Sequence, residues 1–338
     1  MRRIPAAVLL FLLLPACSGQ QAALDVAGDQ ASRIGDIWRL MLWICGAMYV
    51  LVLVGLGAAL WRARRRLAGP PVSDGVESPN ERLMQTALGG WTALIVTGLV
   101  VLALGSFLVD RALARAEAAN ALRIKVTAHQ WWWEIEYDAP VANDRVSTAN
   151  ELHLPVGRAA RVELHSDDVI HSFWIPNLNG KQDLIPGRTN TLTLTPRRVG
   201  SYRGECAEFC GLQHAKMALS VTVETPAAFE AWRRRQLAPA REPSSAEQAR
   251  GKAVFQTAAC GACHQIQGAD NAMGRTGPNL THMAGRRYVA AGALPYNQGS
   301  LAAWIADPQA IKPGVRMPKV PLAPQDLTAL VAYLDSLT

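Results

Sequence analysis

The chain has 338 residues, of which half are hydrophobic, and a formal net charge of +7 at pH 7. This length is enough for two or three domains. Several arginines gather directly after a long apolar stretch, where membrane proteins carry them, so the positive charge does not indicate a nucleic-acid partner. They are Arg62, Arg64, Arg65 and Arg66. The position of these arginines beside a long apolar stretch therefore favours a membrane protein over an entirely water-soluble chain.

The extreme N-terminus has the layout of a secretory signal, with two arginines ahead of an apolar run. Residues 14–17, Leu-Pro-Ala-Cys, resemble the lipobox of bacterial lipoproteins. The resemblance implies that residues 1–16 are a signal peptide of the lipoprotein type and that the Cys17 thiol receives a diacylglycerol. Ordinary signal cleavage nearby is the alternative. Residues 17–37 would then be a periplasmic N-terminal segment.

Two apolar stretches follow, at residues 40–60 and 83–109, and neither contains a charged side chain. Each reaches the length of about 20 residues that crosses a bilayer core. Buried helices of a soluble core are the alternative, but such helices usually keep a polar stripe. We expect a transmembrane hairpin over residues 38–110, with a cytoplasmic loop at 62–82 because of its arginines. Both termini then lie on the periplasmic side of a bacterial inner membrane.

Residues 122–225 have the pattern of a β domain. Residues 123–137 alternate apolar and polar side chains with a period of two, which predicts a half-buried strand. Similar short segments, separated by Gly and Pro, occur at 151–156, 160–166, 190–195 and 218–224. This spacing predicts a small antiparallel sandwich or barrel.

The pattern changes after this region. Residues 226–245 are rich in Pro, Ala and Arg, and we interpret them as a linker with a short helix at 229–236. Residues 246–338 form a helical domain. Its predicted helices are 245–257 with a serine cap, 301–306, and 324–337 opened by a proline.

Six cysteines in an exported chain could form three disulfides. Their positions argue against this, because Cys17 lies at the processing site and Cys45 lies inside the first apolar stretch. The remaining four form two close pairs, Cys206 with Cys210 and Cys260 with Cys263, and each pair belongs to a metal or haem pattern.

The first pair lies in the run Cys206-x3-Cys210-x3-His214-x2-Met217. Soft sulfur and imidazole donors select copper over hard cations. Two thiolates this close can both bridge two copper ions, and each copper then needs one more nitrogen and a weak axial donor. His171 is a candidate for the second nitrogen. Taken singly, these residues could be a disulfide, a core methionine and loop histidines.

Residues 130–224 also resemble the copper domain of cytochrome c oxidase subunit II, including Gln-Trp-Trp-Trp at 130–133 and Ile-Pro-Gly-Arg-Thr-Asn at 185–190. The resemblance implies a cupredoxin barrel. It also implies a binuclear copper A centre, a magnesium ion bound by the Glu208 carboxylate and shared with subunit I, and an exposed indole, Trp131, where electrons enter. The implied copper ligands are His171, Cys206, the backbone carbonyl of Glu208, Cys210, His214 and Met217.

The second pair lies in Cys260-Gly-Ala-Cys263-His264, the attachment pattern of a c-type haem. Its thiols add to the porphyrin vinyl groups, and His264 is the proximal iron ligand. A chance match and a thioredoxin-like site are the alternatives. Residues 246–338 resemble a small class I cytochrome c, in which the proline carbonyl of Gly-Pro-Asn-Leu, here at 277–280, orients the proximal imidazole.

The sixth iron ligand should be a methionine, since Met/His ligation raises the potential of a haem. Met273, Met283 and Met317 are the candidates. Met317 precedes the last predicted helix, where the family places its ligand, so we predict Met317 and assign the other two to packing.

Together these features predict a multidomain membrane protein with a two-helix hairpin, an all-β cupredoxin-like barrel and an all-α class I cytochrome c domain. The resemblance implies subunit II of a bacterial respiratory oxidase. Its partners would be subunits I and III, membrane lipid, and an external donor such as a soluble cytochrome c or quinol–cytochrome c reductase. A copper A nitric oxide reductase is the alternative within this class. A stand-alone electron carrier or a copper chaperone is the alternative from another class.

Overall fold

The computed structural model of the chain describes residues 18–67, 81–114, 120–141 and 144–338. The predicted signal peptide, Cys17 and most of the predicted cytoplasmic loop lie outside these ranges. The chain divides into a helical unit at residues 33–116 and a second unit that contains residues 117–338 together with the residues before 33.

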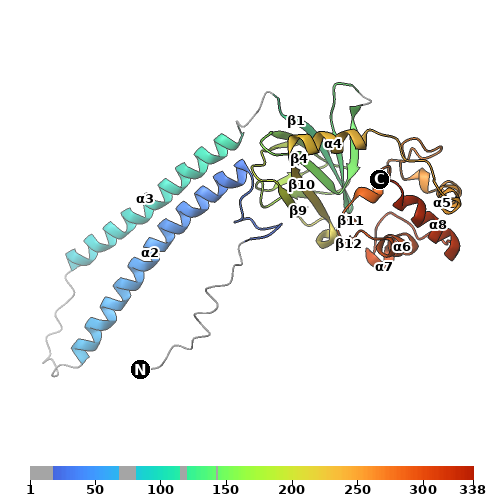
Figure 1. Cartoon of the computed structure of the whole chain (residues 1–338). Coiled ribbons are helices and arrows are strands. Elements are labelled where there is room, and N and C mark those ends of the chain that lie inside the picture. The colour runs from blue at the N-terminus through green and yellow to red at the C-terminus, as the bar shows by residue number, and fades with distance from the viewer. Residues whose placement is uncertain (1–17, 68–80, 115–119, 142–143) are drawn as a thin grey trace. The chain divides into compact units, whose positions relative to one another are not determined.

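The helical unit contains α2 (Asp29–Leu67) and α3 (Glu81–Ala114), drawn in blue and cyan in Figure 1. Both are long and apolar enough to cross a membrane, and they are the two candidate transmembrane helices expected from the sequence. The helices approach each other at glycines. A Cβ atom on Gly98 would lie 3.3 Å from the Ile44 side chain. Small residues permit such close packing between membrane helices.

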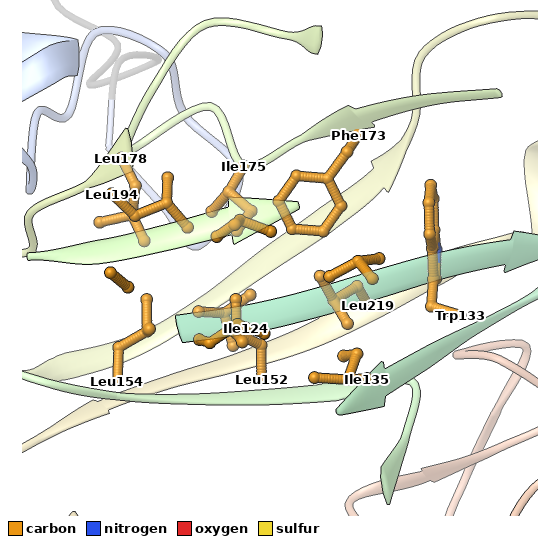
Figure 2. Packing of buried hydrophobic residues seen from close by; sticks show 14 of the residues in the cluster. Ile124, Trp133, Ile135, Leu152, Leu154, Phe173, Ile175, Leu178, Leu194 and Leu219 are labelled. Atoms are coloured by element: carbon orange, nitrogen blue, oxygen red, sulfur yellow. The ribbon is translucent and has the colours of Figure 1, made fainter. Parts of the chain in front are cut away.

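The β domain consists of two five-stranded sheets. The first sheet has the order β3 (Val146–Ala149), β2 (Trp132–Tyr137), β1 (Leu122–His129), β5 (Ala160–Ser166) and β8 (Asn190–Leu194). The second has the order β4 (Glu151–Pro155), β10 (Ala218–Glu224), β9 (Gly200–Cys206), β6 (His171–Trp174) and β7 (Gln182–Leu184). Side chains from both sheets, including Trp133, Ile135, Leu152 and Phe173, form one core (Figure 2).

Two predictions for this domain were wrong in detail. The sheets are mixed, because β1 pairs with β5 and β10 pairs with β4 in parallel. Residues 123–137 form the hairpin β1–β2, with His129 opposite Trp132, and not one strand. Because the turn between β1 and β2 has only two residues, apolar and polar side chains continue to alternate across it. The turn also lacks the Gly or Asn that usually marks a hairpin, so the sequence resembles that of one long strand.

Helix α4 (Pro226–Gln236) belongs to this domain, although we predicted a linker over residues 226–245. Its Phe229 and Trp232 are buried in the same core as the sheets. The Trp232 indole also stacks on the His153 ring at 4.1 Å, and His153 Nδ1 lies 2.8 Å from Glu224 Oε1. The apolar face of α4 therefore fixes it to the sheets. The many prolines, alanines and arginines around these two aromatic residues led us to predict a linker in place of a helix that packs on the sheets.

The C-terminal domain contains α5 (Ala246–Thr257), α6 (Gln298–Ala306), α7 (Pro308–Ile311) and α8 (Pro324–Asp335), with a short hairpin of β11 (Tyr288–Val289) and β12 (Leu294–Pro295). As predicted, the Ser245 side chain caps α5 by accepting from Gln248 N. Helices α5 and α8 are in close contact, since a Cβ atom on Gly251 would lie 2.0 Å from the carbonyl oxygen of Ala329. This domain has its own core, which includes Phe255 and Tyr333.

Candidate functional site

The cysteine-rich loop connects two neighbouring strands of the second sheet. Strand β9 ends at Cys206, β10 begins at Ala218, and the backbone N–H of Cys206 donates to the carbonyl of Met217 at 3.0 Å. Strand β6 begins at His171 and pairs with β9, with Phe173 opposite Cys206. The loop and His171, which lie more than thirty residues apart in the sequence, therefore meet at one end of the sheet.

The donor atoms of the predicted copper ligands converge there. The two sulfur atoms of Cys206 and Cys210 are 3.7 Å apart, which is too long for a disulfide bond of about 2.05 Å. Cys206 Sγ lies 3.7 Å from His171 Nδ1 and 3.2 Å from the carbonyl oxygen of Glu208. Cys210 Sγ lies 3.7 Å from His214 Nδ1 and 3.9 Å from Met217 Sδ. Each thiol thus has one imidazole and one weaker donor, as a pair of bridged copper ions requires.

The two thiols differ in acidity because they share a proton. A hydrogen bond from Cys210, against the opposing effect of burial, lowers the pKa of Cys206 to about 3. The same contact, together with burial, raises the pKa of Cys210. A soft cation bound here would replace that proton and satisfy both sulfur atoms, so the chemistry of the donors fits copper.

Both imidazoles turn Nδ1 toward sulfur, and for His171 the other ring nitrogen is also fixed. Its Nε2 lies 2.9 Å from Asp168 Oδ1. Asp168 accepts two further hydrogen bonds, from the backbone N–H groups of Gln130 at 2.7 Å and Val169 at 2.8 Å. Burial opposes the ionisation of Asp168, but the hydrogen bond from His171 and these N–H groups lower its pKa. The carboxylate therefore holds the His171 ring with Nδ1 toward the thiols.

Glu208 combines a carbonyl directed at Cys206 with an exposed side chain. Its carboxylate oxygen Oε1 lies 3.3 Å from the backbone nitrogen of Phe209. The side chain is accessible on the surface, where a metal ion shared with another protein could reach it.

The resemblance implied an exposed Trp131, but only 6% of Trp131 is exposed. Its indole Nε1 donates to the carbonyl of Cys210 at 2.9 Å, so the ring does contact the cysteine loop. Its outer edge is covered from the C-terminal domain, since a Cβ atom on Gly314 would lie 3.5 Å from the ring. The ring that the resemblance implied to be exposed is therefore covered by the C-terminal domain in this chain.

The residues predicted to attach haem form a second candidate site in the C-terminal domain. Cys260 and Cys263 form no disulfide, and His264 Nδ1 lies 2.8 Å from the carbonyl oxygen of Pro278, which accepts a hydrogen bond from it. A Cβ atom on Gly277 would lie 2.7 Å from His264 Cε1, so glycine is required beside the ring. Burial lowers the pKa of His264, which favours the neutral imidazole. Its Nε2 is then available for iron, and these residues fit a c-type haem.

The three methionine candidates differ in burial. Met283 is buried in the core of the C-terminal domain, and its Sδ lies 3.7 Å from Arg286 Nη1. Met273 is 82% exposed, so its assignment to packing was wrong. Met317 is half-buried, and its backbone carbonyl accepts from Gln309 Nε2 at 3.0 Å, which holds the loop that carries it.

Sequence reasoning missed two residues of this region. Asp168 stands three residues before His171, and an acidic residue so close to a candidate ligand was a usable signal. Lys312 had no such signal, because its partners are backbone carbonyls from distant segments, including that of Trp131 at 2.9 Å.

Comparisons with known proteins match the two domains that carry these candidate sites. The family model of the periplasmic domain of cytochrome c oxidase subunit II matches residues 140–224, and that of cytochrome c matches residues 248–338. The first domain implies copper A and the second implies haem.

Relatives cover nearly the whole chain. Cytochrome c oxidase subunit 2 of Alkalihalophilus pseudofirmus is 36% identical over 337 residues, which cover 97% of this chain and 94% of that protein. The protein of that name from Bacillus subtilis is 30% identical, with 99% and 97% covered. Among solved structures, the periplasmic domain of subunit II of cytochrome oxidase (CoxB) of Bradyrhizobium japonicum is 32% identical, with a TM-score of 0.32, and covers 35% of this chain and 94% of that one. This chain therefore belongs to the cytochrome c oxidase subunit II family.

Proposed function

We propose that this chain is the subunit of a bacterial respiratory oxidase that relays electrons from a fused c-type haem, through a binuclear copper A centre, to subunit I, where oxygen is reduced to water with proton translocation. The family and its two domains support this proposal. The observation that carries it is the convergence of two thiols, two imidazoles and a thioether at one end of the β domain.

In this proposal the Cys206 and Cys210 thiolates would hold the copper pair together with the two imidazoles. The Met217 thioether and the Glu208 carbonyl would be the weaker donors. When bound, the copper pair and the haem supply one-electron transfer. The protein contributes rigidity, because the loop that carries both cysteines is closed by the hydrogen bond from Cys206 N to Met217 O. Fixed ligands keep the geometry constant when the charge changes. The proposed set is His171, Cys206, Glu208, Cys210, His214 and Met217.

For the haem, we propose that Cys260 and Cys263 would attach it covalently and that His264 and Met317 would bind its iron. Met317 is supported over Met283 because the Met283 sulfur faces the Arg286 guanidinium within the core. Trp131 is proposed as the residue through which electrons enter the copper domain, since its indole donates to the carbonyl of Cys210.

Several finer features belong to the same proposal. The Glu208 carboxylate would bind a magnesium ion at the boundary with subunit I, and Cys17 would carry the lipid. Both termini would be periplasmic, subunit III would complete the complex, and a soluble cytochrome c or quinol–cytochrome c reductase would supply electrons. We propose the same domain boundaries as in the sequence analysis, except that α4 belongs to the copper domain. They are the signal peptide at 1–16, the periplasmic segment at 17–37, the transmembrane hairpin at 38–110, the copper domain at 122–225, the linker at 226–245 and the cytochrome c domain at 246–338.

Paramagnetic resonance of the purified, copper-loaded full-length protein tests the proposal. We expect a mixed-valence spectrum, in which two equivalent coppers share one unpaired electron. Cys206→Ser should abolish it, whereas Cys45→Ser, which alters an exposed cysteine of α2, should leave it unchanged. A hyperfine pattern from a single copper in the wild-type protein would contradict the proposal. Oxygen consumption by the purified complex would distinguish it from a nitric oxide reductase.

A further inference from the structure

The segment from the last residue of α7 to the residue before Met317, residues 311–316, lies on the copper domain; we call it the docking loop. Gln213 Nε2 donates to the carbonyl of Pro313 at 2.9 Å, and Lys216 Nζ donates to that of Ile311 at 2.7 Å. Val315 packs against the core of the β domain. Polar and apolar contacts thus join this loop to the loop that carries His214 and Met217.

Lys312 is the buried centre of these contacts, with 1% of its surface exposed. Its Nζ donates to the carbonyls of Trp131 at 2.9 Å, Lys216 at 2.8 Å and Ala290 at 3.1 Å. No carboxylate of the described residues is among its hydrogen-bond or ion-pair partners. Burial lowers the pKa of Lys312 to about 7, while three carbonyl acceptors match the three N–H donors of the ammonium form.

Lysines are almost never fully buried unless they are paired, because removing the ammonium group from water is costly. Two of the three carbonyls here, those of Trp131 and Lys216, belong to the copper domain, and the third, of Ala290, belongs to the C-terminal domain. If the domains separated, the ammonium group would lose the two copper-domain acceptors. The contact is therefore specific for the docked arrangement.

The docking loop also connects the two proposed redox sites. It leads directly into Met317, and its Arg316 guanidinium lies 3.6 Å from Asp168 Oδ2, the carboxylate that orients His171. The Lys312 acceptor Trp131 carries the indole that donates to the loop of Cys210. A displacement of this loop would thus move the Met317 segment relative to the copper ligands.

We propose that Lys312 is a positioning residue that locks the fused cytochrome c domain onto the face of the copper domain formed by Trp131 and the 213–217 loop, and so sets the rate of haem-to-copper electron transfer. This inference rests on the proposed function. With the two domains held together, an electron would pass from haem to copper at a fixed separation. The cytochrome c domain would not first have to diffuse on its linker to reach the copper domain.

The test uses the complete oxidase with both centres loaded and compares Lys312→Met with Lys319→Met. Lys319 lies just beyond the docking loop, is exposed, and pairs with Asp307 inside the C-terminal domain. For Lys312→Met we expect haem-to-copper transfer after flash reduction to slow by about tenfold or more, because small displacements of reacting groups have large effects on rate. The slowed rate should also depend on solvent viscosity. The optical and paramagnetic spectra and both potentials should stay as in the wild type.

Hydrogen–deuterium exchange provides a readout that does not depend on electron transfer: residues 128–134 and 311–316 should lose protection in Lys312→Met and keep it in Lys319→Met. Gly292→Ala is a second variant. Its Cβ atom would lie 2.8 Å from Ala218 Cβ across the same contact, so it should separate the domains even if Lys312→Met does not accumulate.

The inference would be overturned if haem-to-copper electron transfer in these variants kept its wild-type rate, did not depend on viscosity, and was accompanied by unchanged hydrogen–deuterium exchange. Absence of the mixed-valence signal from the wild-type protein would instead contradict the proposed function, so the two failures are distinguishable.

Discussion

Asp168→Asn should weaken copper binding, although it preserves the size of the side chain. Asp168 Oδ1 faces His171 Nε2 at 2.9 Å and Val169 N at 2.8 Å, while Oδ2 faces Gln130 N at 2.7 Å. All of these partners are N–H donors in the metal-binding state. An asparagine has one oxygen and one NH2 group, so either orientation places its NH2 group against a donor.

The size of the effect follows from this geometry. A hydrogen bond to a charged group contributes about 1.5–3 kcal/mol, and about 1.4 kcal/mol corresponds to a tenfold change in affinity. This range agrees with the loss of about 10- to 100-fold in metal affinity when the partner that orients a ligating histidine is removed. We therefore expect Asp168→Asn to bind copper about 10- to 100-fold more weakly than the wild type.

Competition titration of the full-length protein with a copper chelator measures this affinity. Asp167→Asn is the matched control, because the Asp167 carboxylate is 61% exposed and lies 3.4 Å from His129, which is not a candidate copper ligand. The control should bind copper like the wild type. Equal affinities of the two variants would refute the conclusion that the Asp168 carboxylate holds His171 in place for the metal.

Three further predictions concern the rest of the chain. Met317→Ala should leave the haem covalently bound but remove the near-infrared Met-to-iron band and lower the haem potential; if Met283→Ala does so instead, the ligand assignment is wrong. Burial opposes protonation of His153, but its carboxylate partners raise its pKa above 6.5, so its stabilising contribution is complete below pH 6.5 and is lost as pH rises through the raised value. The melting temperature should therefore fall with pH over that window in the wild type, and less steeply in His153→Gln. Gly251→Ala should destabilise the C-terminal domain by about 1–3 kcal/mol in denaturant titration, through overpacking against α8.

Local motifs made most of the metal chemistry predictable from the sequence. The candidate copper ligands from Cys206 to Met217 lie on one loop, so their spacing alone brings the donor atoms together. The predicted haem-attachment residues from Cys260 to His264 are likewise contiguous. The assignment of His171 as a ligand required knowledge of the fold, which came from the resemblance to a known domain. The pairing of β6 with β9, which brings His171 to Cys206, has no signature in the spacing between the two residues.

Contacts between distant segments were not predictable in the same way. The burial of Phe229 and Trp232 on the sheets depends on the tertiary position of α4, whereas their local sequence is rich in Pro, Ala and Arg. The partners of Lys312 are backbone carbonyls, which every residue possesses, so no side-chain pattern identifies them. The expected exposure of Trp131 was also wrong, because the C-terminal domain of the same chain covers the ring.

The burial of Trp131 restricts how electrons can reach the copper domain in this arrangement. A separate donor protein would need to bring its redox group close to the indole, but the docking loop covers the ring and Lys312 occupies its backbone carbonyl. While the loop is in place, it keeps a separate donor from direct contact with the Trp131 ring. If electrons enter the copper domain at Trp131, as proposed, the covalent fusion would replace a diffusional encounter there by a contact built into the fold. The rate of electron transfer would then depend on the Lys312 contact and not on the concentration of a partner.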